Sequence, residues 1–284
     1  MVRSFFIASV FIGIFALLAV DLRGQNLKPD EIVSRHLAAF GSPEKRAAAK
    51  TIMAIATSEF EAINPSVKGG GRAVVVSDPN NLWFVITLNS REYPFEKIGY
   101  FDGKPSLPFS TAGDRSLLGA YLANHSSILG EGLFGGVLSL RWPLFKLDSR
   151  KPRLMGGGTK KIDDRKLYVL DYVPSGGGSS EFTIKLYFDA ETFNHVRTEY
   201  RFEVMPTDAT FGQQNRRASA VAVLTETFSE FKAVDGLMLP HYHRAELSTN
   251  GNTGAHKNIW GVRVSEYRLN QALQPGFFTF DTGQ

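Results

Sequence analysis

Two neighbouring segments that alternate apolar and polar residues constrain the fold more than any other feature of this sequence. Apolar residues occupy every second position in 182–188, and the positions 196, 198, 200, 202 and 204 alternate with charged residues at 195–203. Successive side chains of a strand point to opposite faces, so each segment is expected to be a strand with one buried and one solvated face. The polar stretch Asp189–Thr192 between them predicts a hairpin, which makes the two strands antiparallel.

Similar strand patterns recur along most of the chain. Segments rich in β-branched and aromatic residues are separated by turn sequences such as Gly69-Gly70-Gly71, Asp102-Gly103 and Asp235-Gly236. The further strands expected are 51–61, 72–77, 82–89, 97–101, 218–234, 237–248 and 256–269. Consecutive hairpins of this kind favour one large antiparallel sheet over a parallel sheet built from strand–helix–strand units.

Helices are expected in two places. The first is 26–40, where Pro29 suits the first turn, and Ser42-Pro43-Glu44 then opens a second short helix through Lys50. The second is 113–141, in which four glycines interrupt an apolar run. Repeated glycine weakens a helix by about 1 kcal/mol per residue relative to alanine. We therefore expect short helices or a mobile apolar loop there, and 129–140 as a lid.

The chain begins with a pattern typical of bacterial export. Arg3 precedes an apolar run from Phe5 to Val20, and polarity returns at Asp21. This pattern predicts a signal peptide over 1–24 and a mature domain over 25–284. The alternative is an uncleaved membrane anchor, because the run falls just short of the roughly 18 apolar residues of a candidate membrane span.

The cysteine count and the charge limit the compartment and the partners. The 284 residues contain no cysteine, so an exported form has no disulfide bonds and depends on its core, which suits a bacterial periplasm. The formal net charge is only +4, and basic residues alternate with acidic ones in 197–203. A nucleic-acid-binding surface would concentrate positive charge on one face. We expect no nucleic-acid partner and a monomeric protein.

His241 and His243 are the residues that most suggest chemistry. Residues two apart on a strand share a face, so both imidazoles could bind one metal ion with a third ligand such as His256 or Glu246. A metal-dependent hydrolase is therefore one hypothesis. Two histidines alone do not make a catalytic zinc site, and ordinary polar strand positions are the simpler explanation. The sequence has no G-x-S-x-G elbow and no phosphate-binding loop, so we predict no catalytic residue, bound metal or cofactor.

Several short motifs, in their order along the chain, resemble one family. They are Asp30-Glu31-Ile32-Val33, Ala38-Ala39-Phe40-Gly41, Tyr100-Phe101-Asp102-Gly103-Lys104, Leu186-Tyr187-Phe188-Asp189-Ala190-Glu191-Thr192, Phe231-Lys232-Ala233-Val234-Asp235-Gly236-Leu237-Met238-Leu239-Pro240 and Tyr267-Arg268-Leu269-Asn270. Together they are similar to the periplasmic LolA/LolB-like superfamily, specifically to proteins like outer-membrane lipoprotein-sorting proteins. The resemblance implies an α+β fold in which an unclosed antiparallel β-barrel wraps around a few helices. It also implies an apolar cavity for acyl chains on the concave face.

The resemblance and the 22 phenylalanines together predict a carrier for a lipid or a lipidated protein, with no catalysis. An open barrel partly filled by helices leaves apolar surface free for a hydrophobic ligand. The residues expected to line the cavity are Phe84, Ile86, Leu88, Leu118, Tyr121, Leu122, Phe134, Phe182, Ile184, Leu186 and Phe202. Besides the hydrolase, a third hypothesis is an envelope-assembly scaffold that docks a partner protein, such as an envelope membrane protein, on a sheet edge or the convex face.

Overall fold

The structure, a computed structural model, describes residues 27–63, 66–111, 113–177, 182–204, 220–251 and 254–280. The predicted export signal at 1–24 lies outside the described residues. No helix among the described residues has both the length and the apolar character needed to cross a bilayer.

Twelve strands of the described chain form one sheet in which every neighbouring pair is antiparallel. They are β1 (Ile52–Ile63), β2 (Val67–Ser77), β3 (Leu82–Thr87), β4 (Phe95–Phe101), β5 (Lys104–Ser106), β6 (Arg153–Ile162), β7 (Arg165–Val173), β8 (Phe182–Asp189), β9 (His195–Val204), β10 (Ala220–Val234), β11 (Leu237–Gly251) and β12 (Gly254–Leu269).

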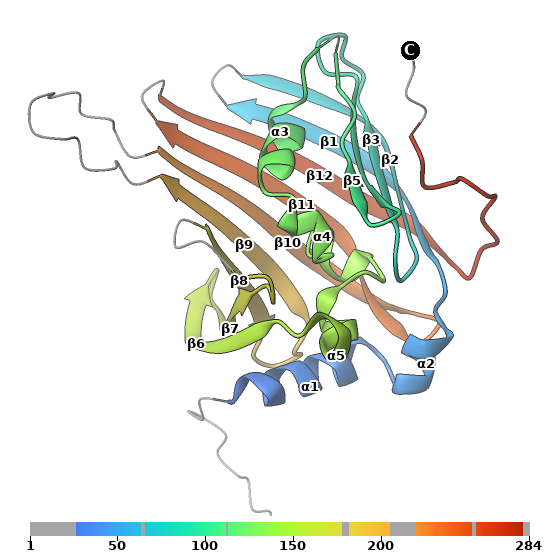
Figure 1. The fold of residues 1–284 in the computed structure, drawn as a ribbon, viewed down its shortest axis with the longest axis vertical. Coiled ribbons are helices and arrows are strands. Elements are labelled where there is room, and N and C mark those ends of the chain that lie inside the picture. The colour runs from blue at the N-terminus through green and yellow to red at the C-terminus, as the bar shows by residue number, and fades with distance from the viewer. Residues whose placement is uncertain are drawn as a thin grey trace, which may run out of the picture.

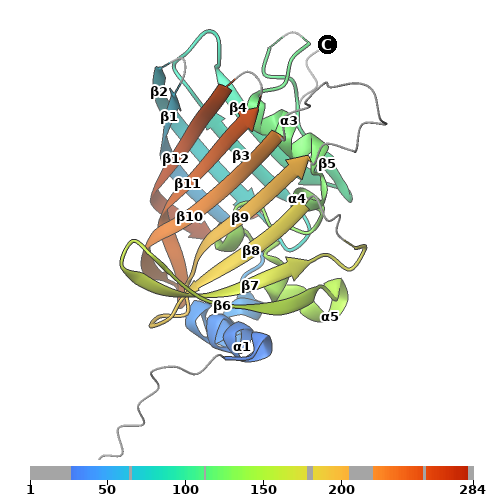
Figure 2. The same cartoon turned by 90° about the vertical axis from the view of Figure 1, so that its left-hand side faces the viewer.

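The order of the strands leaves the barrel open. The sheet runs β5-β4-β3-β2-β1-β12-β11-β10-β9-β8-β7-β6, so β5 and β6 are its two edges and do not pair with each other. The first and last strands of the chain, β1 and β12, meet in the middle of the sheet. Figures 1 and 2 show how the sheet curves around the helical segments. The predicted α+β fold, an unclosed antiparallel barrel around a few helices, is confirmed.

The glycine triplet 69–71 was expected as a turn, and this expectation is wrong. All three glycines lie inside β2, which begins at Val67. The reason is close packing of backbone rather than chain reversal. A Cβ atom on Gly71 would lie 2.1 Å from the carbonyl oxygen of Thr87, at the end of β3. Only glycine allows this approach at position 71, whereas a Cβ atom on Gly69 would meet nothing within 4 Å.

The structure departs from the predicted alternation at the start of β9, where the pairing register with β8 shifts. Pairing between β8 and β9 is irregular at Tyr187 and Phe188, and Phe188 lies opposite His195. A one-residue bulge exchanges the faces of the residues beyond it. His195, expected on the solvated face, is therefore completely buried inside the barrel. Val196 and Tyr187 instead belong to a small apolar cluster whose other buried members are Leu167 and Val169.

Two helices precede the sheet, as expected. They are α1 (Pro29–Phe40) and α2 (Pro43–Ala48). The Ser42 side chain accepts a hydrogen bond from the Lys45 backbone N–H (3.3 Å) and so caps α2. Figure 1 shows α1 beneath one end of the sheet. Its buried residues Ile32, Val33 and Phe40 join the main hydrophobic core, so α1 closes that end of the barrel.

A helical insertion, residues 113–150, connects β5 to β6 on the concave side (Figure 1). It contains α3 (Leu117–Asn124), α4 (Ser127–Gly130), η1 (Gly136–Leu138), η2 (Pro143–Lys146) and α5 (Leu147–Arg150). The expectation of short helices is confirmed. The expectation of a lid over 129–140 is wrong, because Leu129, Leu133 and Leu138 are completely buried. These side chains form the core inside the curved sheet instead of covering an empty space.

Candidate functional site

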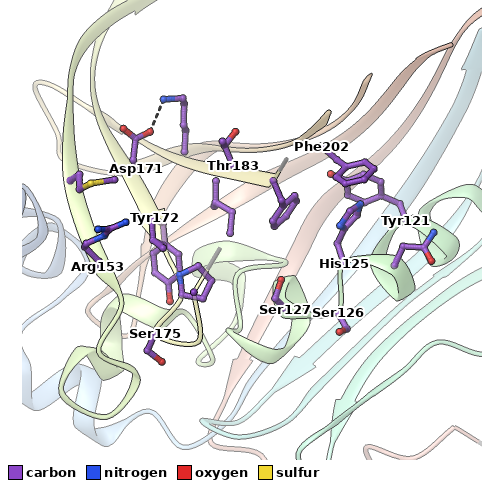
Figure 3. Close-up of a pocket in the computed structure, with 18 of the residues that line it drawn as sticks. Tyr121, His125, Ser126, Ser127, Arg153, Asp171, Tyr172, Ser175, Thr183 and Phe202 are labelled. Atoms are coloured by element: carbon purple, nitrogen blue, oxygen red, sulfur yellow. Dashed lines mark hydrogen bonds and ion pairs between the residues drawn. The ribbon is translucent and has the colours of Figure 1, made fainter. Parts of the chain in front are cut away.

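The helical insertion fills only part of the concave face. A cavity of about 1410 Å³ remains between α3, α4 and the half of the sheet formed by β6–β10. Figure 3 shows the residues around this space. Ligand sites in proteins are commonly concave and mostly apolar, with a few polar groups that orient the ligand. The lining residues are Tyr121, Asn124, His125, Ser126, Ser127, Lys151, Arg153, Met155, Asp171, Tyr172, Val173, Pro174, Ser175, Gly177, Phe182, Thr183, Ile184, Lys185, Phe202 and Ala222.

The structure divides the eleven residues predicted to line a cavity into two groups. Tyr121, Phe182, Ile184 and Phe202 line the cavity. The other seven lie in the hydrophobic core, each at most 5% exposed, and they are Phe84, Ile86, Leu88, Leu118, Leu122, Phe134 and Leu186. Ile184 and Leu186 share a face of β8, so the boundary between cavity and core runs along a single strand.

The side of the cavity next to α3 is aromatic. The His125 ring stacks on Phe182, with 4.8 Å between centroids and 2° between planes. Phe202 and Tyr121 lie at 4.6 and 4.7 Å from the same imidazole. Partial burial of His125 lowers its pKa, so near neutral pH the ring is uncharged. This end of the cavity, which we call the aromatic end, therefore presents flat apolar surfaces without charge.

Two tyrosines contribute ring surface to the cavity while their hydroxyl groups are engaged elsewhere. Tyr121 donates a hydrogen bond to the Tyr200 carbonyl oxygen (3.1 Å), and Tyr172 donates to Glu131 Oε2 (2.6 Å). Burial raises the pKa of both hydroxyl groups, so both remain protonated. The rings are thus fixed in place by bonds that do not involve a ligand.

Charged side chains line the cavity as well. Lys185 Nζ pairs with Asp171 Oδ1 at 2.6 Å. Lys151 and Arg153, just before and at the start of the edge strand β6, have no ion-pair or hydrogen-bonding side-chain partner among the described residues. Figure 3 shows Arg153 on the opposite side of the cavity from His125 and Phe202. Sequence reasoning missed this pair, although Lys151-Pro152-Arg153 is a short basic stretch of the sequence.

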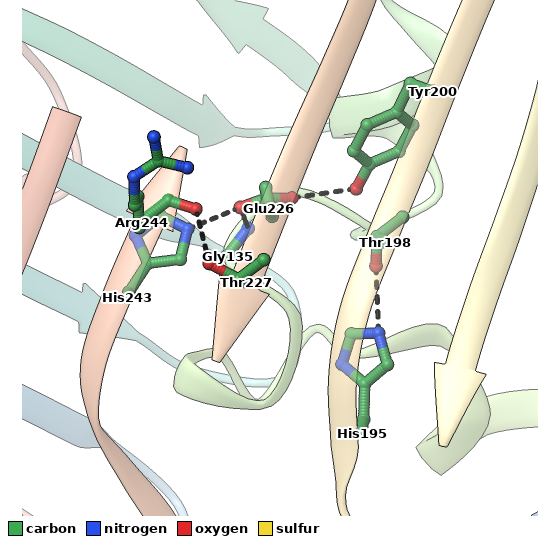
Figure 4. Close-up of polar contacts among 8 residues, drawn as sticks. All are labelled: Gly135, His195, Thr198, Tyr200, Glu226, Thr227, His243 and Arg244. Atoms are coloured by element: carbon green, nitrogen blue, oxygen red, sulfur yellow. Dashed lines mark hydrogen bonds and ion pairs between the residues drawn. The ribbon is translucent and has the colours of Figure 1, made fainter. Parts of the chain in front are cut away.

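A buried polar network joins the insertion to the sheet outside the cavity (Figure 4). Glu226 on β10 is completely buried and accepts three hydrogen bonds. The donors are the Gly135 backbone N–H (2.9 Å), His243 Nε2 (2.8 Å) and the Tyr200 hydroxyl (2.8 Å). Burying a carboxylate is costly unless such donors surround it. The network therefore holds η1 against the three strands β9, β10 and β11.

The two histidines singled out in the sequence do not share a metal-like arrangement. His243 is engaged by Glu226, whereas His241 lies edge-on to Tyr267 at 5.2 Å between ring centroids. Glu246, suggested as a third ligand, forms ion pairs with Arg244 and Lys257. Among the described residues, no group of three histidine, aspartate or glutamate side chains could hold a metal ion.

Taken together, the fold and the cavity define a class of structure: an open antiparallel barrel with a pocket on its concave face that is aromatic on one side and lined by charged side chains elsewhere. No family model matches the chain, and no curated protein matches it.

Several solved structures are similar. One is a LolA superfamily protein from Nitrosomonas europaea, with TM-score 0.46, 13% identity, and coverage of 90% of this chain and 99% of that chain. Another is an outer membrane lipoprotein-sorting protein domain from Vibrio parahaemolyticus, with TM-score 0.43, 11% identity, and coverage of 87% and 94%. A DUF1329 family protein from Desulfovibrio piger has TM-score 0.42, 10% identity, and coverage of 88% and 96%.

The first two structures bear the name of the superfamily, or of the kind of protein, that the sequence motifs resemble. At these identities a structural likeness concerns the fold alone. Proteins with unrelated functions often share a fold, so the function of this chain has to be inferred from its own cavity.

Proposed function

We propose that the protein is a non-catalytic binding or carrier protein for a lipid or an acylated ligand, exported to the bacterial periplasm. The observation that supports this most is the cavity of about 1410 Å³ between the insertion and β6–β10. It combines a large volume with an aromatic end whose single histidine is held neutral by burial. A hydrocarbon chain fits such a surface better than a polar metabolite does.

The energetics favour an acyl chain as the ligand. Each CH₂ group removed from water contributes about 0.8 kcal/mol. Aromatic rings such as Phe182 and Phe202 offer large contact areas at little cost in side-chain entropy. One acyl chain therefore gives useful binding affinity without a covalent bond or a metal ion. The proposal needs no catalytic residue.

The cavity residues proposed to contact the ligand include four of those expected from the sequence, Tyr121, Phe182, Ile184 and Phe202. The ligand is a lipid or the acyl chain of a lipidated protein, and delivery of it would involve an envelope membrane protein. The export signal over 1–24 belongs to the same proposal, since a carrier of this kind works between two membranes.

A cavity-filling substitution tests the proposal. Ala222 on β10 lines the cavity and lies opposite Phe202. Ala222→Trp places an indole in the space that the ligand would occupy. We expect purified wild-type protein to bind a fluorescent fatty acid, and we expect the affinity of A222W to fall at least tenfold.

A matched control separates blocking of the cavity from damage to the fold. Ala233 lies on the same strand, is exposed, and does not line the cavity. Ala233→Trp is expected to bind the probe as wild type does. If A222W unfolds like wild type and still binds the probe with unchanged affinity, the cavity is not the binding site and the proposal fails.

A further inference from the structure

Charge is distributed unevenly around the cavity, and this asymmetry bears on the kind of ligand. The lining includes three cationic side chains, Lys151, Arg153 and Lys185, and one carboxylate, Asp171. Lys185 is neutralised by Asp171 at 2.6 Å. The charges of Lys151 and Arg153 are not balanced by any ion pair within the described part of the chain.

The two unbalanced cations and the aromatic end lie on different sides of the cavity. Figure 3 shows Arg153 at the β6 side, across from His125, Tyr121 and Phe202. Lys151 lies two residues before Arg153, the first residue of that strand, and both side chains are exposed. Since β6 is an edge strand with no neighbour on its outer side, the cations stand where the cavity meets solvent. The cavity is therefore polarised, with an uncharged apolar end and a cationic mouth.

From this arrangement we propose that the ligand is an amphiphile with a negatively charged head group, bound with its hydrocarbon chain at the aromatic end and its head group beside Lys151 and Arg153. This inference rests on the proposed function and adds a head-group preference to it.

The chemistry of the two cations suits a carboxylate or a phosphate. The planar guanidinium of Arg153 can donate two parallel hydrogen bonds to two oxygens, while the Lys151 ammonium acts as a mobile point charge. Both groups are solvated, so each contributes a modest attraction that salt weakens. The head group is therefore expected to tune a binding affinity that the hydrocarbon chain supplies.

The test compares ligands that share one hydrocarbon chain and differ in head-group charge. A long-chain fatty acid is compared with the corresponding alcohol, and lysophosphatidylglycerol is compared with lysophosphatidylcholine. Displacement of a fluorescent fatty acid from wild-type protein, near neutral pH and at low salt, gives the four affinities. We expect the anionic member of each pair to bind about tenfold more tightly, and added salt to reduce this ratio.

Two double variants show which side chains cause the preference. K151Q/R153Q removes the two cations at the mouth and should reduce the ratio to about one. K160Q/K161Q removes the same charge from the same strand, outside the cavity lining, and should leave the ratio unchanged. All four substituted residues are exposed, so we expect both variants to keep the wild-type unfolding temperature.

Each outcome distinguishes the inference from the function on which it rests. Equal affinities within both pairs, or a preference that survives in K151Q/R153Q, would overturn the head-group inference and leave the lipid-binding function intact. Failure of all four ligands to bind wild type would overturn both. A preference for the fatty acid without a preference for lysophosphatidylglycerol would restrict the head group to a carboxylate, whereas the reverse would restrict it to a phosphate.

Discussion

The two parts of the concave face, one filled and one hollow, are built by the same sheet and the same kind of side chain. In the filled part, Phe134 from the insertion is 1% exposed and contacts Phe84 with 5.4 Å between ring centroids. In the hollow part, Phe202 is only half-buried and faces the cavity. The apolar residues do not differ in type. What differs is whether the helical insertion supplies a side chain that packs against them.

The filled part also carries the buried polar groups that fix the insertion. Glu226 holds the Gly135 backbone, and the Arg141 guanidinium donates to the carbonyl oxygens of Leu129 (2.6 Å) and Gly130 (3.1 Å). Burial lowers the pKa of Arg141 to about 10, so it remains charged near neutral pH. The hollow part has no comparable network among the described residues. A rigid filled part thus shapes an empty one, as a preformed binding site requires.

The comparison predicts a large difference between two Phe→Ala substitutions. Phe134→Ala removes a fully buried ring and should lower the free energy of unfolding by about 4 kcal/mol. Phe202→Ala should lower it by about 1 kcal/mol, because part of that ring already faces the cavity, yet it should weaken fatty-acid binding. Urea denaturation and probe titration of both variants check this. Equal losses of stability would show that the cavity is packed in solution.

Removal of the buried carboxylate comes next in expected size. Glu226→Ala leaves the Gly135 N–H, His243 Nε2 and the Tyr200 hydroxyl without their acceptor, and each unsatisfied buried group costs about 1–3 kcal/mol. We expect a total loss of about 3 kcal/mol in urea denaturation. Glu266→Ala, at a side chain that is 50% exposed and pairs with Arg268, should leave the free energy of unfolding almost unchanged, because solvent screens that ion pair. A similar small loss for Glu226→Ala would mean that the network does not hold the insertion.

His36 in the filled part predicts a dependence of stability on pH. Its Nε2 accepts from Trp142 Nε1 (3.0 Å), and burial lowers its pKa from 6.5 to about 4. The unfolded chain therefore takes up a proton below pH 6.5 that the folded protein resists until about pH 4. The stabilisation is complete above pH 6.5 and is lost as the pH falls toward 4, by at most about 3 kcal/mol.

Glu96 changes the stability with pH in the opposite direction to His36, so variants are needed to separate the contributions of the two groups. Burial raises the Glu96 pKa from 4.5 to about 7, and its stabilisation is lost as the pH rises through that range. The difference between wild type and His36→Gln, measured by urea denaturation from pH 4 to 7, isolates the histidine. Parallel curves would contradict a buried neutral His36.

The sequence predicted the approximate ranges of nine of the twelve described strands, because alternation is a local signal, but it gave no range for β5, β6 or β7. It placed the β8–β9 hairpin and the helices α1 and α2 within a few residues. It failed at His195 and at Gly71, where a bulge and a close backbone approach depend on the neighbouring strand. Such features arise from pairing, which a single alternating pattern does not encode.

The position of the cavity was harder to predict for a related reason. Ile184 and Leu186 are both apolar, both on the inward face of β8, and both were expected at a ligand site. Only Ile184 lines the cavity, because the core covers Leu186 completely. The boundary between core and cavity lies where the helical insertion stops covering the sheet. The position of the insertion depends on tertiary contacts such as the hydrogen bond from the Gly135 N–H to Glu226. The cationic mouth depends in the same way on how β6 lies at the sheet edge.

The smallest expected effect concerns the mouth of the cavity and needs no further variant. Raising the salt concentration should weaken binding of a fatty acid several-fold and leave binding of the corresponding alcohol almost unchanged, because salt screens the two solvated cations. Isothermal titration at two salt concentrations measures both. An equal change in affinity for both ligands would show that Lys151 and Arg153 do not attract the head group of the fatty acid.

Native mass spectrometry of the protein purified from the cells that produce it tests the central claim most directly. The claim is that the hollow part of the concave face holds a hydrophobic ligand. We predict an additional mass that organic solvent extracts as a lipid or acylated molecule, and that is missing from A222W but present on A233W. A wild-type protein that carries no extra mass and takes up no added lipid would contradict the claim.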